Sequence, residues 1–265
     1  MRIILAFALC MTASMARADD SVLLYAAGSL RSALTDVARA FKAATGTAVQ
    51  AKFGPSGLLK DEIAGGAKAE VFASANMEHP QALAAGKRSG PVVLFARNEL
   101  CALAGLELAV TSESLLDVML DPNVKLGTST PRADPSGDYA FALFRKAEAL
   151  KPGAQAALER KALQLTGGAS SATPPPGRLV YSWHLEEGRA DMFLAYCTAA
   201  REAQKQSPAL KVVAVPRALA VGADYGLTVI EGASPAAYRF AMFVLSVEGQ
   251  GILSGYGFGA PNLPQ

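Results

Sequence analysis

Short apolar runs along the chain are each followed by a segment in which apolar residues recur every three or four positions. The first run ends at Gly28-Ser29, and apolar residues from Leu30 to Phe41 then follow at helical spacing. The same order of apolar run, turn and helical pattern recurs twice before residue 90. Strands that alternate with helices predict a parallel sheet with helices on its faces. These first elements are predicted as strands at 23–27, 48–53 and 69–75 and helices at 29–44, 58–63 and 80–85.

The remainder of the chain continues with predicted strands and helices of ordinary length. A region rich in Gly, Ser and Pro at 167–177 predicts a surface loop. A Gly-rich tail at 255–259 follows the last predicted helix. The further elements are predicted as strands at 92–96, 99–104, 124–128, 192–196, 211–216 and 225–230 and helices at 115–120, 139–150, 179–187 and 235–247.

Three serines stand at turns that precede predicted helices: Ser29, Ser56 and Ser136. Ser29 occupies a position typical of a helix N-cap, where the first backbone N–H groups have no partner within the helix. Those N–H groups and the helix dipole favour an anion. Because ligands of such sheets collect beyond the carboxyl ends of the strands, Ser29 and Ser56 are candidate anion-binding residues. Each serine could instead act only as a cap or, at Ser136, belong to an ordinary Ser-Gly turn.

The first 18 residues have the features of a secretory signal peptide. A basic Arg2 precedes an apolar run that is too short to span a bilayer, and Ala16-Arg17-Ala18 is a cleavage signal. Cleavage after Ala18 would leave 247 of the 265 residues in an exported, periplasmic protein. Without Arg2 and Arg17, 23 basic residues face 23 acidic ones, which argues against a nucleic-acid surface but not against a small anion.

Two cysteines remain in the mature chain, Cys101 and Cys197. In an oxidising compartment they could form one disulfide, and equally they could be two buried thiols.

An enzymatic function finds little support in the sequence. Gly54-Pro55-Ser56-Gly57 lacks the spacing of a nucleophile elbow, and only His79 and His184 could serve as a base. No His/Cys cluster has the spacing of metal ligands, so we expect neither a metal ion nor a cofactor. A secreted hydrolase with an unseen triad is the competing class.

Several segments, in their order along the chain, resemble periplasmic molybdate-binding proteins. The later ones include a strand that ends in Tyr196, as in that family, and the similarity extends over nearly the whole mature chain. Tyr196 could otherwise be a core aromatic with its hydroxyl at the rim. The similar segments are 26–30, 53–56, 69–75, 135–140, 188–196 and 225–232 with 256–258.

This resemblance implies a type 2 periplasmic binding protein, in which two α/β lobes with mixed sheets are joined by two crossing hinge strands. Lobe I would comprise residues 19–96 and 217–265 and lobe II residues 97–216. Such lobes close on their ligand by hinge motion. By analogy with the family, neutral donors in the cleft would hold molybdate or tungstate, and a monomer would deliver it to the membrane permease of an ABC importer. The implied ligand residues are Ser29, Ser56, Ser136 and Tyr196, together with the backbone N–H near Arg178.

Two of these positions depart from the family pattern. The family has a small apolar residue at the place of Ser136 and an aliphatic one near Arg178. An Arg178 side chain in the cleft would add a full charge and could change the preferred anion, so sulfate, phosphate or a small carboxylate are alternative cargoes. Asp138 is the nearby carboxylate that could accept a hydrogen bond from a protonated anion.

Overall fold

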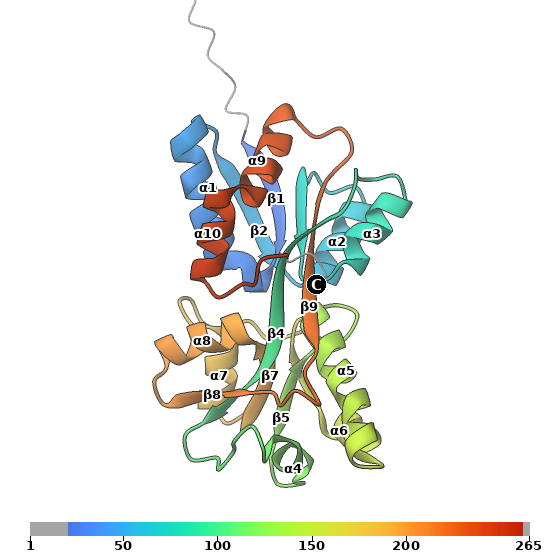
Figure 1. Ribbon diagram of the computed structural model, residues 1–265, viewed down its shortest axis with the longest axis vertical. Helices are drawn as coiled ribbons and strands as arrows, with labels where there is room; N and C mark the ends of the chain where they lie inside the picture. The colour runs from blue at the N-terminus through green and yellow to red at the C-terminus, as the bar shows by residue number, and fades with distance from the viewer. Residues whose placement is uncertain (1–20, 262–265) are drawn as a thin grey trace, which may run out of the picture.

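The chain folds into two α/β lobes joined by two long strands (Figure 1). A computed structural model describes residues 21–261. The predicted signal peptide, 1–18, lies outside the described residues. Among those described, no helix has the length and apolar character needed to cross a bilayer. The predicted fold class is confirmed.

The strands lie in the order β2-β1-β3-β9-β4-β7-β5-β6, and β8 pairs with β4. Strands β1, β2 and β3 are parallel, as the repeated unit predicts, whereas β9 is antiparallel to both β3 and β4. The strands are β1 (Val22–Ala27), β2 (Val49–Gly54), β3 (Val71–Ser74), β4 (Val93–Gly105), β5 (Leu126–Ser129), β6 (Leu163–Thr166), β7 (Met192–Tyr196), β8 (Leu210–Ala214) and β9 (Gly222–Val229).

Strand β4 connects the two lobes. Its first half pairs with β9 and its second half with β7 and β8, so the two segments predicted at 92–96 and 99–104 are one strand. Arg97 and Asn98 interrupt the apolar pattern because both make polar contacts where the hinge strands cross: Arg97 pairs with Asp224, and Asn98 contacts Tyr225. The predicted lobe limit at 96/97 falls within this strand.

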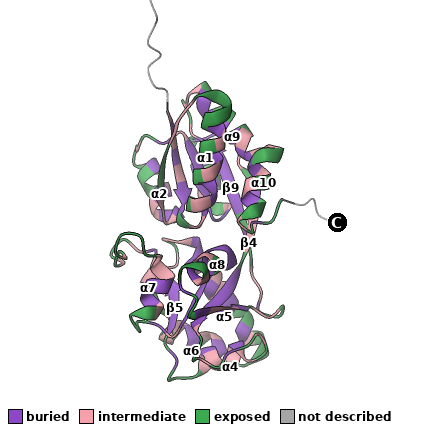
Figure 2. Cartoon of the chain, turned by 90° about the vertical axis from the view of Figure 1, so that its left-hand side faces the viewer, coloured by how far each residue is buried: buried purple, intermediate pink, exposed green. Residues whose placement is uncertain are grey.

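In each lobe, helices cover both faces of the sheet (Figure 1). In lobe I, α1, α9 and α10 pack together, and Phe41 of α1 meets Phe240 of α9 edge-on with ring centroids 5.3 Å apart. Strands form the buried interior of both lobes (Figure 2). The helices are α1 (Arg31–Thr45), α2 (Ser56–Ala64), α3 (Glu78–Ala85), α4 (Leu115–Leu120), α5 (Pro135–Leu150), α6 (Ala154–Lys161), α7 (Val180–Glu186), α8 (Cys197–Gln206), α9 (Pro235–Leu245) and α10 (Val247–Gly255), with a 3-10 turn η1 (Gly28–Leu30) before α1.

Four elements were not predicted from the sequence: α6, β6, α8 and α10. Helix α8 begins directly after β7 with no turn residue between them, so no boundary is visible there. Strand β6 has only four residues, two of them exposed, and its apolar alternation is too short to identify a strand. Helix α10 contains three glycines, which disfavour helix on propensity alone.

The two remaining cysteines form a disulfide. Cys101 lies in the second half of β4 and Cys197 is the first residue of α8; their sulfur atoms are 2.01 Å apart. The bond fixes the start of α8, and therefore the end of β7, to the hinge strand.

Candidate functional site

A cavity of about 650 Å³ lies between the lobes. Lobe I contributes the turn after β1 and the β2–α2 turn, and lobe II contributes the residue before α5, the segment 166–181 and the end of β7. Of the five predicted site residues, Ser29, Arg178 and Tyr196 line this cavity. Ser56 and Ser136 are fully buried beside lining residues, Pro55 and Asp134 respectively.

Ser29 lies in the 3-10 turn η1 and does not cap α1. The N-cap of α1 is Leu30, and no side chain caps that helix, so the predicted N-cap role of Ser29 is wrong. The turn continues directly into the helix and leaves the Ser29 side chain free to point elsewhere. Its Oγ forms a 2.9 Å hydrogen bond with the hydroxyl of Tyr225 on β9.

The hydroxyl of Tyr225 connects Ser29 with the hinge. Asn98 of β4 donates from Nδ2 to this hydroxyl at 3.3 Å and to Thr198 Oγ1 of α8 at 2.9 Å. Burial raises the pKa of Tyr225 far above its usual value, so the phenol stays neutral. This chain of hydrogen bonds joins both lobes at the crossing strands, and neither Tyr225 nor Asn98 was singled out from the sequence.

Ser56 is the first residue of α2 and accepts a hydrogen bond on Oγ from the backbone N–H of Ala75 at 3.1 Å. Its own O–H proton is used in no hydrogen bond of the described residues. Directly after it, the N–H of Gly57 donates to the carbonyl of Ala133 at 2.9 Å, and the lobes touch there. A Cβ at Gly57 would lie 2.2 Å from the Arg132 carbonyl oxygen, so only glycine permits this contact.

Ser136 and Tyr196 each bury a hydroxyl that has no hydrogen-bond partner among the described residues. Ser136 is 0% exposed and Tyr196 is 2% exposed. The Tyr181 hydroxyl approaches Ser136 without reaching hydrogen-bond geometry. Tyr196 stands between the rings of Tyr139 and Tyr225, with centroid distances of 6.2 and 5.6 Å. Burial raises the pKa of Tyr196, so its phenol is a neutral donor.

Two residues with carboxylate side chains line the cavity, Asp134 and Glu202, and the sequence interpretation missed both. Asp134 lines the cavity and caps α5: Oδ1 accepts from the Ser136 N–H at 3.1 Å, and Oδ2 accepts from Ser129 Oγ at 2.6 Å. Asp138, which was expected to be the nearby acceptor, is not among the lining residues and accepts from the Arg132 N–H at 2.9 Å.

A signal for Asp134 was present in the sequence. Aspartate directly before a proline is typical of a helix start, with Asp as N-cap and Pro at the first helical position. That signal would have started α5 at Pro135, where it begins, and not at Tyr139.

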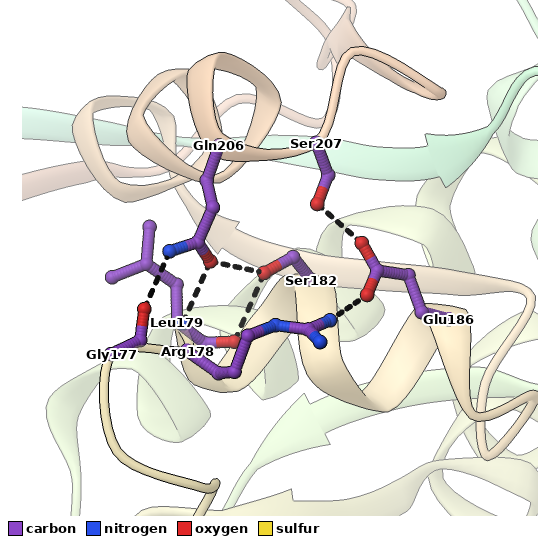
Figure 3. Close-up of polar contacts among 7 residues, drawn as sticks. All are labelled: Gly177, Arg178, Leu179, Ser182, Glu186, Gln206 and Ser207. Atoms are coloured by element: carbon purple, nitrogen blue, oxygen red, sulfur yellow. Dashed lines mark hydrogen bonds and ion pairs between the residues drawn. The ribbon is translucent and has the colours of Figure 1, made fainter.

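Arg178 has both its backbone and its side chain engaged within the protein. Its N–H donates to the carbonyl of Pro175 at 3.1 Å, and its guanidinium forms an ion pair with Glu186 (Figure 3). Glu186 also accepts from the hydroxyl of Ser207. The Arg178 side chain is 39% exposed and lies at the rim of the cavity. The backbone N–H of Arg178, which was the predicted donor, is therefore already engaged in this conformation.

Gln206 holds the adjoining segment in place (Figure 3). Its Nε2 donates to the Gly177 carbonyl at 2.7 Å, while its Oε1 accepts from the Leu179 N–H at 2.9 Å and from Ser182 Oγ at 3.1 Å. The glutamine at the end of α8 thereby fixes the loop that forms one wall of the cavity to the start of α7.

The described residues thus form a cleft between two lobes that is lined in part by the hydroxyl groups of Ser29 and Tyr196. The model of the bacterial extracellular solute-binding protein family matches residues 22–259. The chain belongs to this family. Its sequence is 37% identical over 205 residues to the uncharacterised protein PM1146 of Pasteurella multocida, which covers 77% of this chain and 85% of that protein. It is 32% identical over 124 residues to the molybdate-binding protein ModA of Mycobacterium tuberculosis, covering 43% and 48% of the two chains.

Solved structures show which fold this solute-binding protein shares. The periplasmic molybdate-binding protein of Azotobacter vinelandii superposes with a TM-score of 0.69 at 18% identity and covers 92% of this chain and 100% of that one. The sulfate-binding protein SubI of Mycobacterium tuberculosis has a TM-score of 0.74 at 16% identity, covering 91% and 87%. Such identities show the type 2 periplasmic binding fold alone, and that fold is shared by binders of different solutes.

Proposed function

We propose that this solute-binding protein captures a tetrahedral oxyanion, with molybdate or tungstate as the first candidates, between its lobes for delivery to the permease of an ABC importer. The observation that carries the proposal is the pair of buried hydroxyls at Ser136 and Tyr196 without partners in the described chain. A buried polar group left unpaired costs about 1–3 kcal/mol, and an oxyanion that accepts from both groups would remove that cost.

The remaining predicted residues fit the same role. Ser29 lines the cavity with a hydroxyl that can exchange its bond to Tyr225 for one to a ligand, and the Ser56 proton is uncommitted. Neutral donors suit a dianion because hydrogen bonds to charged acceptors are about twice as strong as neutral ones and strengthen further when lobe closure excludes water. Arg178 is proposed as a rim residue, with its charge balanced by Glu186.

The choice of molybdate or tungstate draws on the similar ModA and Azotobacter proteins, whose names state what they bind. SubI, which has the same fold, is named a sulfate-binding protein, and PEB3, another protein of this fold, has a crystal structure with bound L-phospholactate. Sulfate, phosphate or a small carboxylate therefore stay as alternative cargoes. A hydrolase fits less well because neither His79 nor His184 lines the cavity that holds the serines.

Thermal melting with molybdate, tungstate, sulfate and phosphate tests the proposal. A ligand at about a hundred times its Kd adds roughly 2.7 kcal/mol of stability. We expect Ser29→Ala and Ser56→Ala each to weaken binding by about 1–3 kcal/mol, since each leaves a charged acceptor with one donor fewer. Ser254→Ala on the exposed face of α10 is the matched control. Unchanged affinity in both site variants would refute the proposed site.

A further inference from the structure

One wall of the cavity carries an acidic acceptor, Asp134, in the same lining as the hydroxyl groups of Ser29 and Tyr196. Asp134 lies two residues before the buried Ser136 and lines the same cavity as Ser29 and Tyr196. Each of its oxygens accepts one hydrogen bond, from the Ser136 N–H and from Ser129 Oγ. An ionised carboxylate has about four acceptor positions, so acceptor capacity remains toward the cavity.

The chain makes room for this carboxylate. Gly167 packs directly against it with φ of 80°, and a Cβ there would lie 2.2 Å from Ser129 Oγ and 2.7 Å from Asp134 Oδ2. Only glycine adopts this backbone conformation readily and leaves the required space. The backbone at Gly167 therefore packs closely around the Asp134 carboxylate, which does more than cap the start of α5.

No cation of the described chain is paired with Asp134, which takes part in none of the ion pairs. On its own helix the nearest charge is the like charge of Asp138. The elements that face Asp134 contribute three tyrosines, which remain neutral. The other charged residues that line the cavity are Arg31, Arg178 and Glu202. The tyrosines are Tyr181 of α7, Tyr196 of β7 and Tyr225 of β9; the charge of Asp134 contributes to raising the pKa of each.

From this geometry we propose that Asp134 is a specificity-determining residue that makes the oxyanion bind together with one proton. The inference rests on the proposed function. An unprotonated dianion such as molybdate or sulfate cannot donate to a carboxylate and is repelled by it, so it binds when Asp134 itself is protonated. A monoprotonated oxyanion, such as hydrogen phosphate or a phosphomonoester monoanion, brings the proton and donates it in a hydrogen bond to the ionised Asp134.

The direction of the pH dependence follows from linkage. Burial already raises the pKa of Asp134 in the free protein, and an adjacent dianion raises it further. Binding of molybdate or sulfate is then coupled to proton uptake. Between the pKa of Asp134 in the free protein and the higher pKa in the complex, the affinity falls about tenfold for each unit of rising pH.

Isothermal titration with molybdate, sulfate and inorganic phosphate between about pH 5 and 8 tests the inference. The protein forms compared are the wild type, Asp134→Asn and Asp138→Asn. Asparagine caps helices as well as aspartate does, so the first variant keeps the acceptor for the Ser136 N–H. Asp138→Asn is the matched control, because Asp138 lies on the same helix and outside the cavity lining. Repeating the titration in buffers of different ionisation enthalpy measures the proton uptake.

We expect the wild type and Asp138→Asn to lose affinity for molybdate as pH rises and to take up a proton on binding. Asp134→Asn should bind molybdate without either effect and should shift the sulfate-to-phosphate preference toward sulfate by at least about tenfold, since the amide no longer repels an unprotonated oxygen. Affinity that is independent of pH in the wild type, or an equal dependence of affinity on pH in Asp134→Asn, would overturn this inference and leave the proposed function standing. Failure of all three anions to bind would instead remove the proposed function.

Discussion

Deleting the hydroxyl of Tyr196 should stabilise the ligand-free protein and weaken ligand binding at the same time. The Tyr196→Phe substitution keeps the ring, which packs edge-on against Tyr139 and Tyr225, and removes only the oxygen. That oxygen is buried and has no partner among the described residues, so the folded state loses the cost of a desolvated, unpaired group. The cost is about 1–3 kcal/mol, from which some packing contact of the oxygen must be subtracted.

We therefore expect the free energy of unfolding to rise by about 1 kcal/mol without ligand. For a protein of this size that corresponds to roughly 2–4 °C in Tm. With a bound oxyanion the same hydroxyl would donate to a charged acceptor, and its loss costs about 1.5–3 kcal/mol, or roughly a ten- to hundredfold increase in Kd. The two effects have opposite signs, which is the expected behaviour of a group kept for binding and not for folding.

Calorimetric melting with and without molybdate and titration of the anion measure both effects on one protein sample. Tyr238→Phe is the control, because Tyr238 is 52% exposed on α9 and should change neither quantity. A second deletion of the same kind, Ser136→Ala, should behave as Tyr196→Phe does. If the Tyr196→Phe protein is less stable without ligand and binds the anion unchanged, the Tyr196 hydroxyl serves the fold and the reasoning is refuted.

Three further predictions concern the frame around the site. Breaking the Cys101–Cys197 bond by reduction, which opens a separation of 96 residues, should lower stability by up to roughly 4–5 kcal/mol, and a Tm unchanged by reductant in the native protein would contradict this. Gly57→Ala would push its Cβ against the Arg132 carbonyl oxygen and hold the lobes apart, seen as a larger radius of gyration in small-angle scattering with molybdate present. Gln206→Ala removes three hydrogen bonds to the segment before and at the start of α7, and that segment should then be cleaved faster in limited proteolysis, whereas equal cleavage would mean that the glutamine does not hold it.

Several elements whose boundaries have a local chemical cause were predicted from the sequence. Strand β7 and helix α4 have the bounds expected from their apolar patterns, and the three parallel strands of lobe I follow the repeated unit. Among the missed elements, α8 has no such local cause. Helix α8 follows β7 with no turn residue because the disulfide at Cys197 and the buried small residues of its inner face hold its start, and these are tertiary effects.

Two candidate donors, Ser29 and Ser56, were predictable because a position directly after a strand lies at the edge of the sheet where ligands collect. The ligand roles of Ser136, Tyr196 and Arg178 came instead from the family resemblance. Ser29, Arg178 and Tyr196 line the cavity, and Ser56 and Ser136 are buried next to lining residues. What local pattern cannot predict is the partner of each group. The unpaired state of two hydroxyls and the bond from Ser29 to Tyr225, 196 positions away, depend on how the lobes meet.

The carboxylate of Asp134 changes what the donors imply about selectivity. Four neutral donors alone would rank anions by charge and size, and would favour any dianion that fits. With an unneutralised acid in the same cavity, the sign of the electrostatic contribution depends on where one proton resides, so two anions of equal size, sulfate and hydrogen phosphate, are distinguished. We therefore expect the protonation state of the anion to affect selectivity more than its radius does. A change of pH should alter the preferred cargo without a change in the shape of the cavity.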